Sequence, residues 1–318
     1  MDHSTSFPKP YPAATNATSE QPSNHTKLNH CSSQVTDHAS SSEHSHSSST
    51  GTDNKAVSLG SLGTCHDTPI DALPSLGHGT PEVLEITKIL ENAGICCCLV
   101  GISALKYYGA WRVRHDWEIC VPTDMLEKAS QIFKSEPHCQ TYETCAPNIP
   151  QISSLLHTFP RFKIKGVYLY FVILPAEDAH LNCVPSNIER SQTGLPYPKL
   201  SVFAQSLLET YDEVALTDLV DGMNLTEEWG SENLDLAGTT DGSYALLKNE
   251  KIRASVPPTE DTYLLELPRR PGSKRTIWER IVSTKERRMG IELPKEHYAT
   301  RFYARCFGDP RLQKRDFV

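Results

Sequence analysis

The pattern of apolar and polar positions changes near residue 80, where a segment able to form a core begins. Apolar residues recur at helical spacing over TPEVLEITKILENAG, which opens with Thr80 as a capping residue and Pro81 at the first helical position. The next run, ICCCLVG, is short and continuously apolar, as expected of a buried strand. Its three consecutive cysteines are interpreted as small buried hydrophobes. We therefore predict a helix that ends at Gly94, followed by a strand.

A second strand is predicted in HDWEICVP, because its apolar and polar residues alternate with a period of two. Trp117, Ile119 and Val121 share one face, which is suited to a core. Asp116 and Glu118 share the opposite face. The strand therefore turns two carboxylates away from its apolar side.

Helices and strands continue to alternate along the chain. SALKYYGA is predicted to form a short helix capped by Ser103, and DMLEKASQIFKS a longer one. FKIKGVYLYFVILP is the longest strand candidate. Beyond residue 200, SVFAQSLLETYDEVALTDLVDG and TIWERIVSTKERRMG favour helices, and the stretch between them favours a loop. This order predicts an α+β fold, with a mixed sheet flanked by helices over 79–200 and a mostly helical region over 201–318.

Residues 1–78 have the composition of a disordered tail. They are rich in Ser, Thr and His and poor in large aliphatic residues, so they cannot bury enough apolar surface to offset the entropy of ordering. His38, His44 and His46 could bind a metal ion weakly. A plain polar tail is the favoured interpretation.

Composition and charge narrow the class of protein. The chain has a formal net charge of −8 and ten cysteines, but no CxxC pair of the kind that zinc knuckles use. No apolar run reaches the roughly 18–20 residues that span a bilayer. We expect a cytoplasmic protein in a reducing compartment, with no membrane partner.

The basic end of the chain is a candidate contact for nucleic acid. Residues 269–318 carry more Lys and Arg than acids, and Trp278 could stack on a base. A solvated basic run with Trp278 in the core is favoured. Asp218 and Asp221 stand three residues apart in a helical segment, where caps and turns explain them well.

The two strand acids suit a divalent cation. At positions i and i+2 of a strand their Cα atoms lie ~6.5–7 Å apart, so both carboxylates can lean toward one or two ions. Oxygen ligands suit Mg²⁺, which binds the phosphates of nucleotides. A solvated acidic face would explain the acids alone. It would not explain the turn at Gly101 and Ser103, which could hold an anion, or the neighbouring Arg112 and Arg114.

These residues resemble the signature of the polymerase-β-type nucleotidyltransferase superfamily, and most of all its diverged fungal nucleotidyltransferase-like proteins. That signature is a Gly-Gly or Gly-Ser turn opening a helix, followed by an acid–hydrophobic–acid strand. The resemblance covers about residues 82–174 and implies a nucleotidyltransferase-like sheet, a nucleoside triphosphate and Mg²⁺. It implies that Asp116 and Glu118 are catalytic and bind the metal. It implies that the triphosphate is bound by Gly101, Ser103, Arg112 and Arg114.

Two departures from the family pattern leave the activity open. Ile102 replaces the second glycine of the turn. Where active members carry a third acid, this chain offers Tyr168 or Tyr170, and a protonated phenol is a poor Mg²⁺ ligand. Glu177 and Asp178 could substitute only from a turn beyond the strand.

Three hypotheses follow from these residues. The first is Mg²⁺-dependent transfer of a nucleotidyl group from a nucleoside triphosphate to an unknown acceptor. The second is a non-catalytic module of the same fold that binds a nucleotide or a protein. The third is a structural interaction protein, in which Asp116 and Glu118 would be splayed apart and paired with Arg112 and Arg114.

Overall fold

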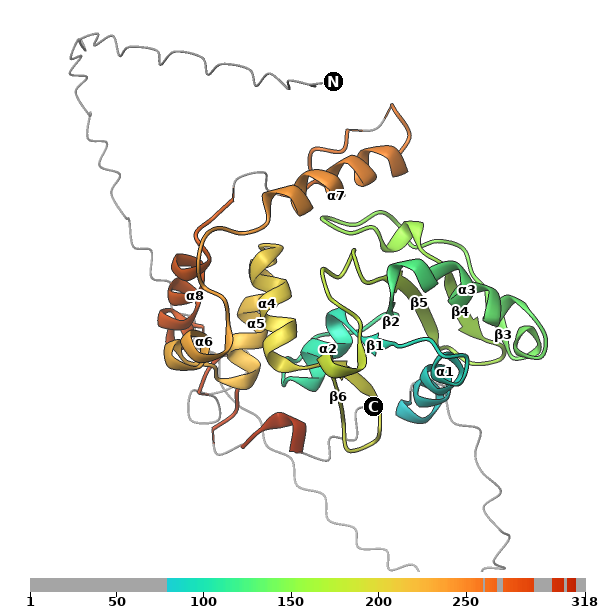
Figure 1. Ribbon diagram of the computed structural model, residues 1–318, viewed down its shortest axis with the longest axis horizontal. Coiled ribbons are helices and arrows are strands. Elements are labelled where there is room, and N and C mark those ends of the chain that lie inside the picture. Colours follow the sequence, from blue (N-terminus) through green and yellow to red (C-terminus); the bar gives the residue numbers. More distant parts are fainter. Residues whose placement is uncertain (1–78, 260, 268–270, 289–298, 306–307, 313–318) are drawn as a thin grey trace, which may run out of the picture. The chain divides into compact units, whose positions relative to one another are not determined.

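The computed structural model contains a mixed five-stranded sheet with the order β1-β2-β5-β4-β3 (Figure 1). The structure describes residues 79–259, 261–267, 271–288, 299–305 and 308–312. Strands β2 and β5 run parallel, and the other neighbours in the sheet run antiparallel. Two further strands pair with each other outside this sheet. The strands are β1 (Cys98–Leu99), β2 (Trp117–Val121), β3 (Tyr142–Thr144), β4 (Arg161–Ile164), β5 (Tyr170–Pro175), β6 (Ile188–Arg190) and β7 (Pro196–Pro198).

Three helices accompany the sheet: α1 (Thr80–Asn92), α2 (Gly101–Tyr107) and α3 (Leu126–Lys134). Helix α1 confirms the helix predicted there, but Gly79 rather than Thr80 occupies the N-cap position. Helix α2 also begins earlier than predicted. Its N-cap is Val100, and Ser103 lies inside the helix, so Ser103 does not cap it. Short 3₁₀ turns lie at Thr123–Met125, His138–Gln140, Leu156–Thr158, Pro185–Asn187, Lys285–Arg287 and Pro310–Leu312.

The C-terminal part is helical, as predicted. Its helices are α4 (Leu200–Glu209), α5 (Glu213–Met223), α6 (Glu227–Asn233), α7 (Gly242–Ser255) and α8 (Lys274–Ser283). Helices α4, α5, α6 and α8 gather beside one another in Figure 1, and α5 packs on α2. The loop predicted between the two helical segments is wrong, because α6 and α7 form there. Each of these two helices has a capping side chain at its start, Thr226 and Asp241 respectively.

The two faces of the sheet contribute to two separate apolar clusters. Trp117, Ile119 and Val121 lie in the larger cluster, which confirms the predicted core face of β2. The opposite face carries a smaller cluster that includes Cys120 and Leu174. The face that holds the two acids is therefore partly apolar itself.

The α+β class with a mixed sheet and a helical C-terminal part is thus confirmed. The described residues of both predicted regions, 79–200 and 201–318, belong to one compact unit. The predictions for residues 1–78, including the three histidines, lie outside the described residues. In the described part of the chain, no helix combines the length and the apolar character needed to cross a membrane.

The basic end of the chain is only partly described. Trp278 is fully buried and lies so close to Gly230 that a Cβ there would collide with the indole ring. This confirms the core position favoured for Trp278 and leaves its ring no face for stacking on a base. Several of its basic residues form ion pairs within the fold, among them Arg280 with Glu213 and Arg288 with Asp221.

Candidate functional site

Glu118 lies in strand β2 against the start of helix α2. Gly101, the first residue of that helix, has a φ of 54°, and a Cβ there would collide with the Glu118 carboxylate. The backbone N–H of Ile102 donates to the same carboxylate. A side chain of the protein therefore takes the position at the helix start where the resemblance would put a phosphate. Gly101 is needed there for its positive φ and for this close approach.

The environment of Glu118 favours its neutral form. Burial raises the pKa of Glu118 to about 7, and the charges of Asp178 and Asp116 act in the same direction. The N–H of Ile102 and the charge of Lys248 oppose this shift. Near neutral pH the carboxyl group is therefore divided between its protonated and ionised forms.

Asp116 is bound on both of its carboxylate oxygens. Arg161 of β4 donates from Nε to Oδ2 at 2.7 Å and from Nη2 to Oδ1 at 3.1 Å. Asn148 donates a third hydrogen bond to Oδ2 at 2.9 Å. Only 8% of the Asp116 side chain and 18% of the Arg161 side chain are exposed. Such a two-pronged, largely buried pair holds the carboxylate in one orientation.

Tyr170 lies at the position where the resemblance would place a third acid. Its ring carries the Arg161 guanidinium 4.4 Å from the ring centroid. Tyr170 comes one residue before Phe171, which pairs with Trp117 in the parallel register, so it stands next to Asp116 in the sheet. The neighbour of Asp116 at this position is therefore the Arg161 guanidinium on the Tyr170 ring, and not a third carboxylate.

The other predicted site residues are divided between different places. Ser103 is buried in α2, and its hydroxyl has no hydrogen-bond partner within the described residues. Arg112 pairs with Asp218, and the Arg114 guanidinium lies 3.2 Å from the centroid of the Trp117 ring. Burial lowers the pKa of Arg114 to about 10. Gly101, Arg112 and Glu118 thus remain together, whereas Ser103 and Arg114 lie elsewhere.

These contacts also bear on the structural hypothesis, which pairing of Asp116 and Glu118 with Arg112 and Arg114 would have supported. Instead Asp116 pairs with Arg161, and Glu118 contacts the start of α2.

A cleft of about 760 Å³ opens beside Glu118. Its walls come from the start of α2, the turn after β5, and helices α4, α5 and α7. Asp218 of α5 lies in this wall and is 1% exposed. Its Oδ1 has no hydrogen-bond partner within the described residues. The polar and aromatic residues in the walls include Arg112, Glu118, Asp178, Tyr211, Asp212, Glu213, Asp218, Tyr244 and Lys248.

The pair formed by Asp178 and Lys248 was missed by the sequence reasoning. Lys248 Nζ lies 3.0 Å from Asp178 Oδ1 and 3.0 Å from the Tyr244 hydroxyl. Asp178 and Lys248 are only 9% and 11% exposed. The two residues are 70 positions apart, and no local pattern connects them. The one local signal was the acid Asp178 near the end of the strand, which the sequence indicated as a possible substitute for the third acid.

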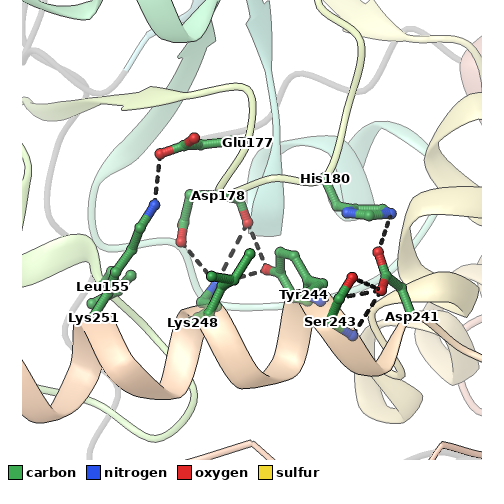
Figure 2. Close-up of a pocket in the computed structure, with 10 residues that line it drawn as sticks. Leu155, Glu177, Asp178, His180, Asp241, Ser243, Tyr244, Lys248 and Lys251 are labelled. Atoms are coloured by element: carbon green, nitrogen blue, oxygen red, sulfur yellow. Dashed lines mark hydrogen bonds and ion pairs between the residues drawn. The ribbon is translucent and has the colours of Figure 1, made fainter. Parts of the chain in front are cut away.

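A smaller pocket of about 230 Å³ adjoins the cleft and shares three of its residues. Figure 2 shows Asp178 and Lys248 directed toward each other in this pocket, with Glu177 and Lys251 to one side. The other candidate acid, Glu177, therefore also pairs with a lysine of α7, at 2.6 Å. Both carboxylates that could have replaced the third acid are engaged by α7.

The acids as arranged do not fit Mg²⁺. In the described part of the chain, one group of three or more Cys, His or acidic ligand atoms converges, and it consists of Cys98, Cys120 and Cys183. The carboxylates of Asp116 and Glu118 are not part of it. Thiols are poor ligands for Mg²⁺, which takes oxygen donors.

No protein-family model matches this chain, and no curated protein is significantly similar to it. The resemblance to nucleotidyltransferases therefore depends on the residues between Gly101 and Glu118 and on the strand that follows them.

Proposed function

We propose that this protein is a non-catalytic nucleotide-binding module with a nucleotidyltransferase-like fold. The observation that carries this proposal is the engagement of Asp116 by Arg161 and Asn148. In the family that the chain resembles, the first strand acid is a metal ligand. Here an arginine occupies both of its oxygens, and an arginine cannot be deprotonated to free them. Asp116 therefore holds Arg161 of β4 in the position where the resemblance would place a metal ion.

The cleft beside Glu118 supports ligand binding. Its volume of about 760 Å³ lies within the range of roughly 300–1,000 Å³ that small-molecule sites occupy. Tyr211 and Tyr244 provide aromatic surface in its walls. Asp218 adds a buried acceptor, Oδ1, that lacks a partner within the described residues, and such a group calls for a donor. The exocyclic amine of a base or a ribose hydroxyl would supply one.

The charge of the cleft favours a ligand with few negative charges. Five acids line it, of which Glu118 is partly protonated near neutral pH, against two cations, Arg112 and Lys248. Both cations are already paired with acids, Asp218 and Asp178. A triphosphate would add charge that these walls cannot neutralise. A nucleoside or nucleoside monophosphate fits this electrostatic field better.

A second function, nucleotidyl transfer, is supported by the pKa of Glu118. A carboxyl group with a pKa of about 7 is suited to accept a proton from an attacking hydroxyl. This function would require Asp116 to separate from Arg161.

The binding proposal is tested by melting the full chain with nucleosides and with nucleoside mono- and triphosphates. A rim residue of the cleft, Val214, is 64% exposed, so Val214→Trp should narrow the cleft without disturbing the core. We expect it to weaken binding by about tenfold or more, or roughly 1.4 kcal/mol. Val113 is 76% exposed and is not in the cleft wall, which makes Val113→Trp the matched control. Binding that is absent, or equal in both variants, would refute the proposal.

Catalysis is tested separately with labelled nucleoside triphosphates and Mg²⁺. The non-catalytic proposal predicts no labelled product from the wild type above that from Asp116→Asn or Glu118→Gln. Glu143→Gln is the matched control, because Glu143 is an acid of the same sheet that pairs with Lys163 away from the cleft. Product that depends on Asp116 and Glu118 would establish the second function instead.

A further inference from the structure

Four cysteines meet on the acid-bearing side of the sheet. Cys96 and Cys98 are two positions apart, so an extended chain turns both to one side. Cys98 stands directly opposite Cys120 in the pairing of β1 with β2. Cys183 arrives from the segment after β5. Cys97 faces the other way, since its thiol donates to the Thr87 carbonyl and its side chain lies in the larger core.

The sulfur atoms of this cluster converge. The Sγ atoms of Cys98, Cys120 and Cys183 all lie within 4.8 Å of one another. The Cys183 thiol also has a hydrogen-bond contact with the thiol of Cys96. We define the thiol cluster as Cys96, Cys98, Cys120 and Cys183. All four are free cysteines.

We propose that the thiol cluster is a zinc site, in which Cys98, Cys120 and Cys183 bind as thiolates and Cys96 supplies the fourth ligand. Tetrahedral Zn–S bonds of about 2.3 Å place neighbouring sulfurs about 3.8 Å apart. Sulfurs already within 4.8 Å reach that spacing through small side-chain rotations. Each S–Zn bond forms as a thiol proton is released to solvent.

The surroundings of the cluster select a thiophilic ion. The buried wall around it consists of aliphatic side chains, among them Val100, Leu174 and Leu181. No carboxylate belongs to the converging group, so hard ions such as Mg²⁺ and Ca²⁺ lack the charged oxygen ligands that they prefer. Cys96 is only partly buried, whereas the other three cysteines of the cluster are buried.

A bound ion would connect three separate parts of the chain. It would join β1 to β2 and both strands to the segment that runs from the end of β5 to Cys183. That segment carries Asp178, which lines the cleft. The inference does not depend on nucleotide binding, because it rests on the thiols alone.

The test uses the full chain, purified under reducing and anaerobic conditions, stripped with a chelator and titrated with Co²⁺. We expect uptake of one ion per chain with the intense thiolate-to-cobalt charge-transfer absorption, which Zn²⁺ then abolishes by displacement. Cys98→Ser, Cys120→Ser and Cys183→Ser should each lose this absorption. Cys97→Ser is the matched control, because Cys97 is equally buried but faces the other core, and it should retain the absorption. The triple variant His38→Asn/His44→Asn/His46→Asn should also retain it.

Three results would overturn the proposal. The first is a reduced, folded chain that takes up cobalt without thiolate absorption. The second is an equal spectrum in the wild type and in Cys98→Ser. If the serine variants fail to fold, alkylation of the wild type decides. Zinc should slow the alkylation of the four cluster thiols at least about tenfold, or roughly 1.4 kcal/mol of protection, and leave Cys139 unchanged. The third overturning result is that the four thiols are alkylated at equal rates with and without zinc. A disulfide within the cluster, found instead of free thiols, would count in the same way.

Discussion

Arg161 stabilises the fold through its ion pair with Asp116. The substitution Arg161→Met should show how much this pair contributes to the free energy of unfolding. The Asp116 side chain is only 8% exposed, and in Arg161→Met its carboxylate would lose its charged partner and keep the hydrogen bond from Asn148. Breaking a fully buried pair costs about 3–5 kcal/mol, and an exposed pair about 0–1 kcal/mol. Because this pair is largely but not completely buried, we expect the free energy of unfolding to fall by about 2–4 kcal/mol.

The matched control shares strand β4 with Arg161, but its partner lies on β3. Lys163 of β4 pairs with Glu143 at 2.5 Å, but their side chains are 33% and 40% exposed. Lys163→Met should therefore cost about 0–1 kcal/mol. Both variants are measured by urea unfolding followed by circular dichroism, with the slope compared to detect changes in the unfolded state.

A double-mutant cycle sharpens the result. In Asp116→Asn the negative charge is absent, so Arg161→Met should cost less there than in the wild type, by about 1–2 kcal/mol. The reasoning is refuted if Arg161→Met and Lys163→Met destabilise the protein equally. It is also refuted if the cycle shows no coupling between positions 116 and 161.

Two further predictions concern the carboxylate next to helix α2. The pKa of Glu118 is raised from 4.5 to about 7, so the folded protein binds an extra proton between these values, and stability should fall by a few kcal/mol as pH rises from about 4.5 through 7. Glu118→Gln should flatten this part of a stability–pH profile measured by urea unfolding, and an unchanged slope would contradict the assignment. Gly101→Ala meets both a φ of 54° and the Glu118 carboxylate, so it should lower the free energy of unfolding by about 2–4 kcal/mol. Gly238→Ala, at a φ of 72° with no atom near the new Cβ, should cost only about 1 kcal/mol, and equal costs would argue against the Glu118 contact.

Local patterns predicted β2 and the core face of the sheet well. The single strand predicted in FKIKGVYLYFVILP is wrong, because this segment forms two antiparallel strands, β4 and β5, and strands β3, β6 and β7 were not predicted. The alternation in HDWEICVP identified β2 and turned Trp117, Ile119 and Val121 toward the core, as the structure has them. Period-two burial is a property of a few adjacent residues, so a short window contains it. The same holds for the amphipathic helix α1.

Helix starts and the missed helices were harder to predict. Helix α2 starts at Gly101 without a side-chain cap, because the positive φ of Gly101 and the Glu118 carboxylate shape that start. Ser103 was the better capping residue by type but lies inside the helix. Helix α7 has no continuous apolar stripe, and its exposed Leu246 and Leu247 stand beside buried Ala245. Its own start is capped by Asp241, and its lysines Lys248 and Lys251 pair with Asp178 and Glu177 far away in the sequence.

The partners of the site residues could not be predicted from local sequence patterns. Asp116 and Arg161 are 45 positions apart, and Arg112 and Asp218 are 106 apart. The interpretation of Asp218 and Asp221 as caps or turn residues is wrong, because both are buried inside α5 and paired with Arg112 and Arg288. A sequence shows that acids and arginines are present, but only the fold determines which of them meet.

The central claim is that the nucleotide binds in the cleft without a metal held by Asp116. Isothermal titration tests it most directly, with the nucleoside monophosphate that gives the largest melting shift. The titration is run on the wild type and Asp116→Asn, each with and without Mg²⁺. The account predicts dissociation constants that agree within about threefold, or roughly 0.7 kcal/mol, in all four cases. Binding that requires Mg²⁺ and disappears in Asp116→Asn would contradict it.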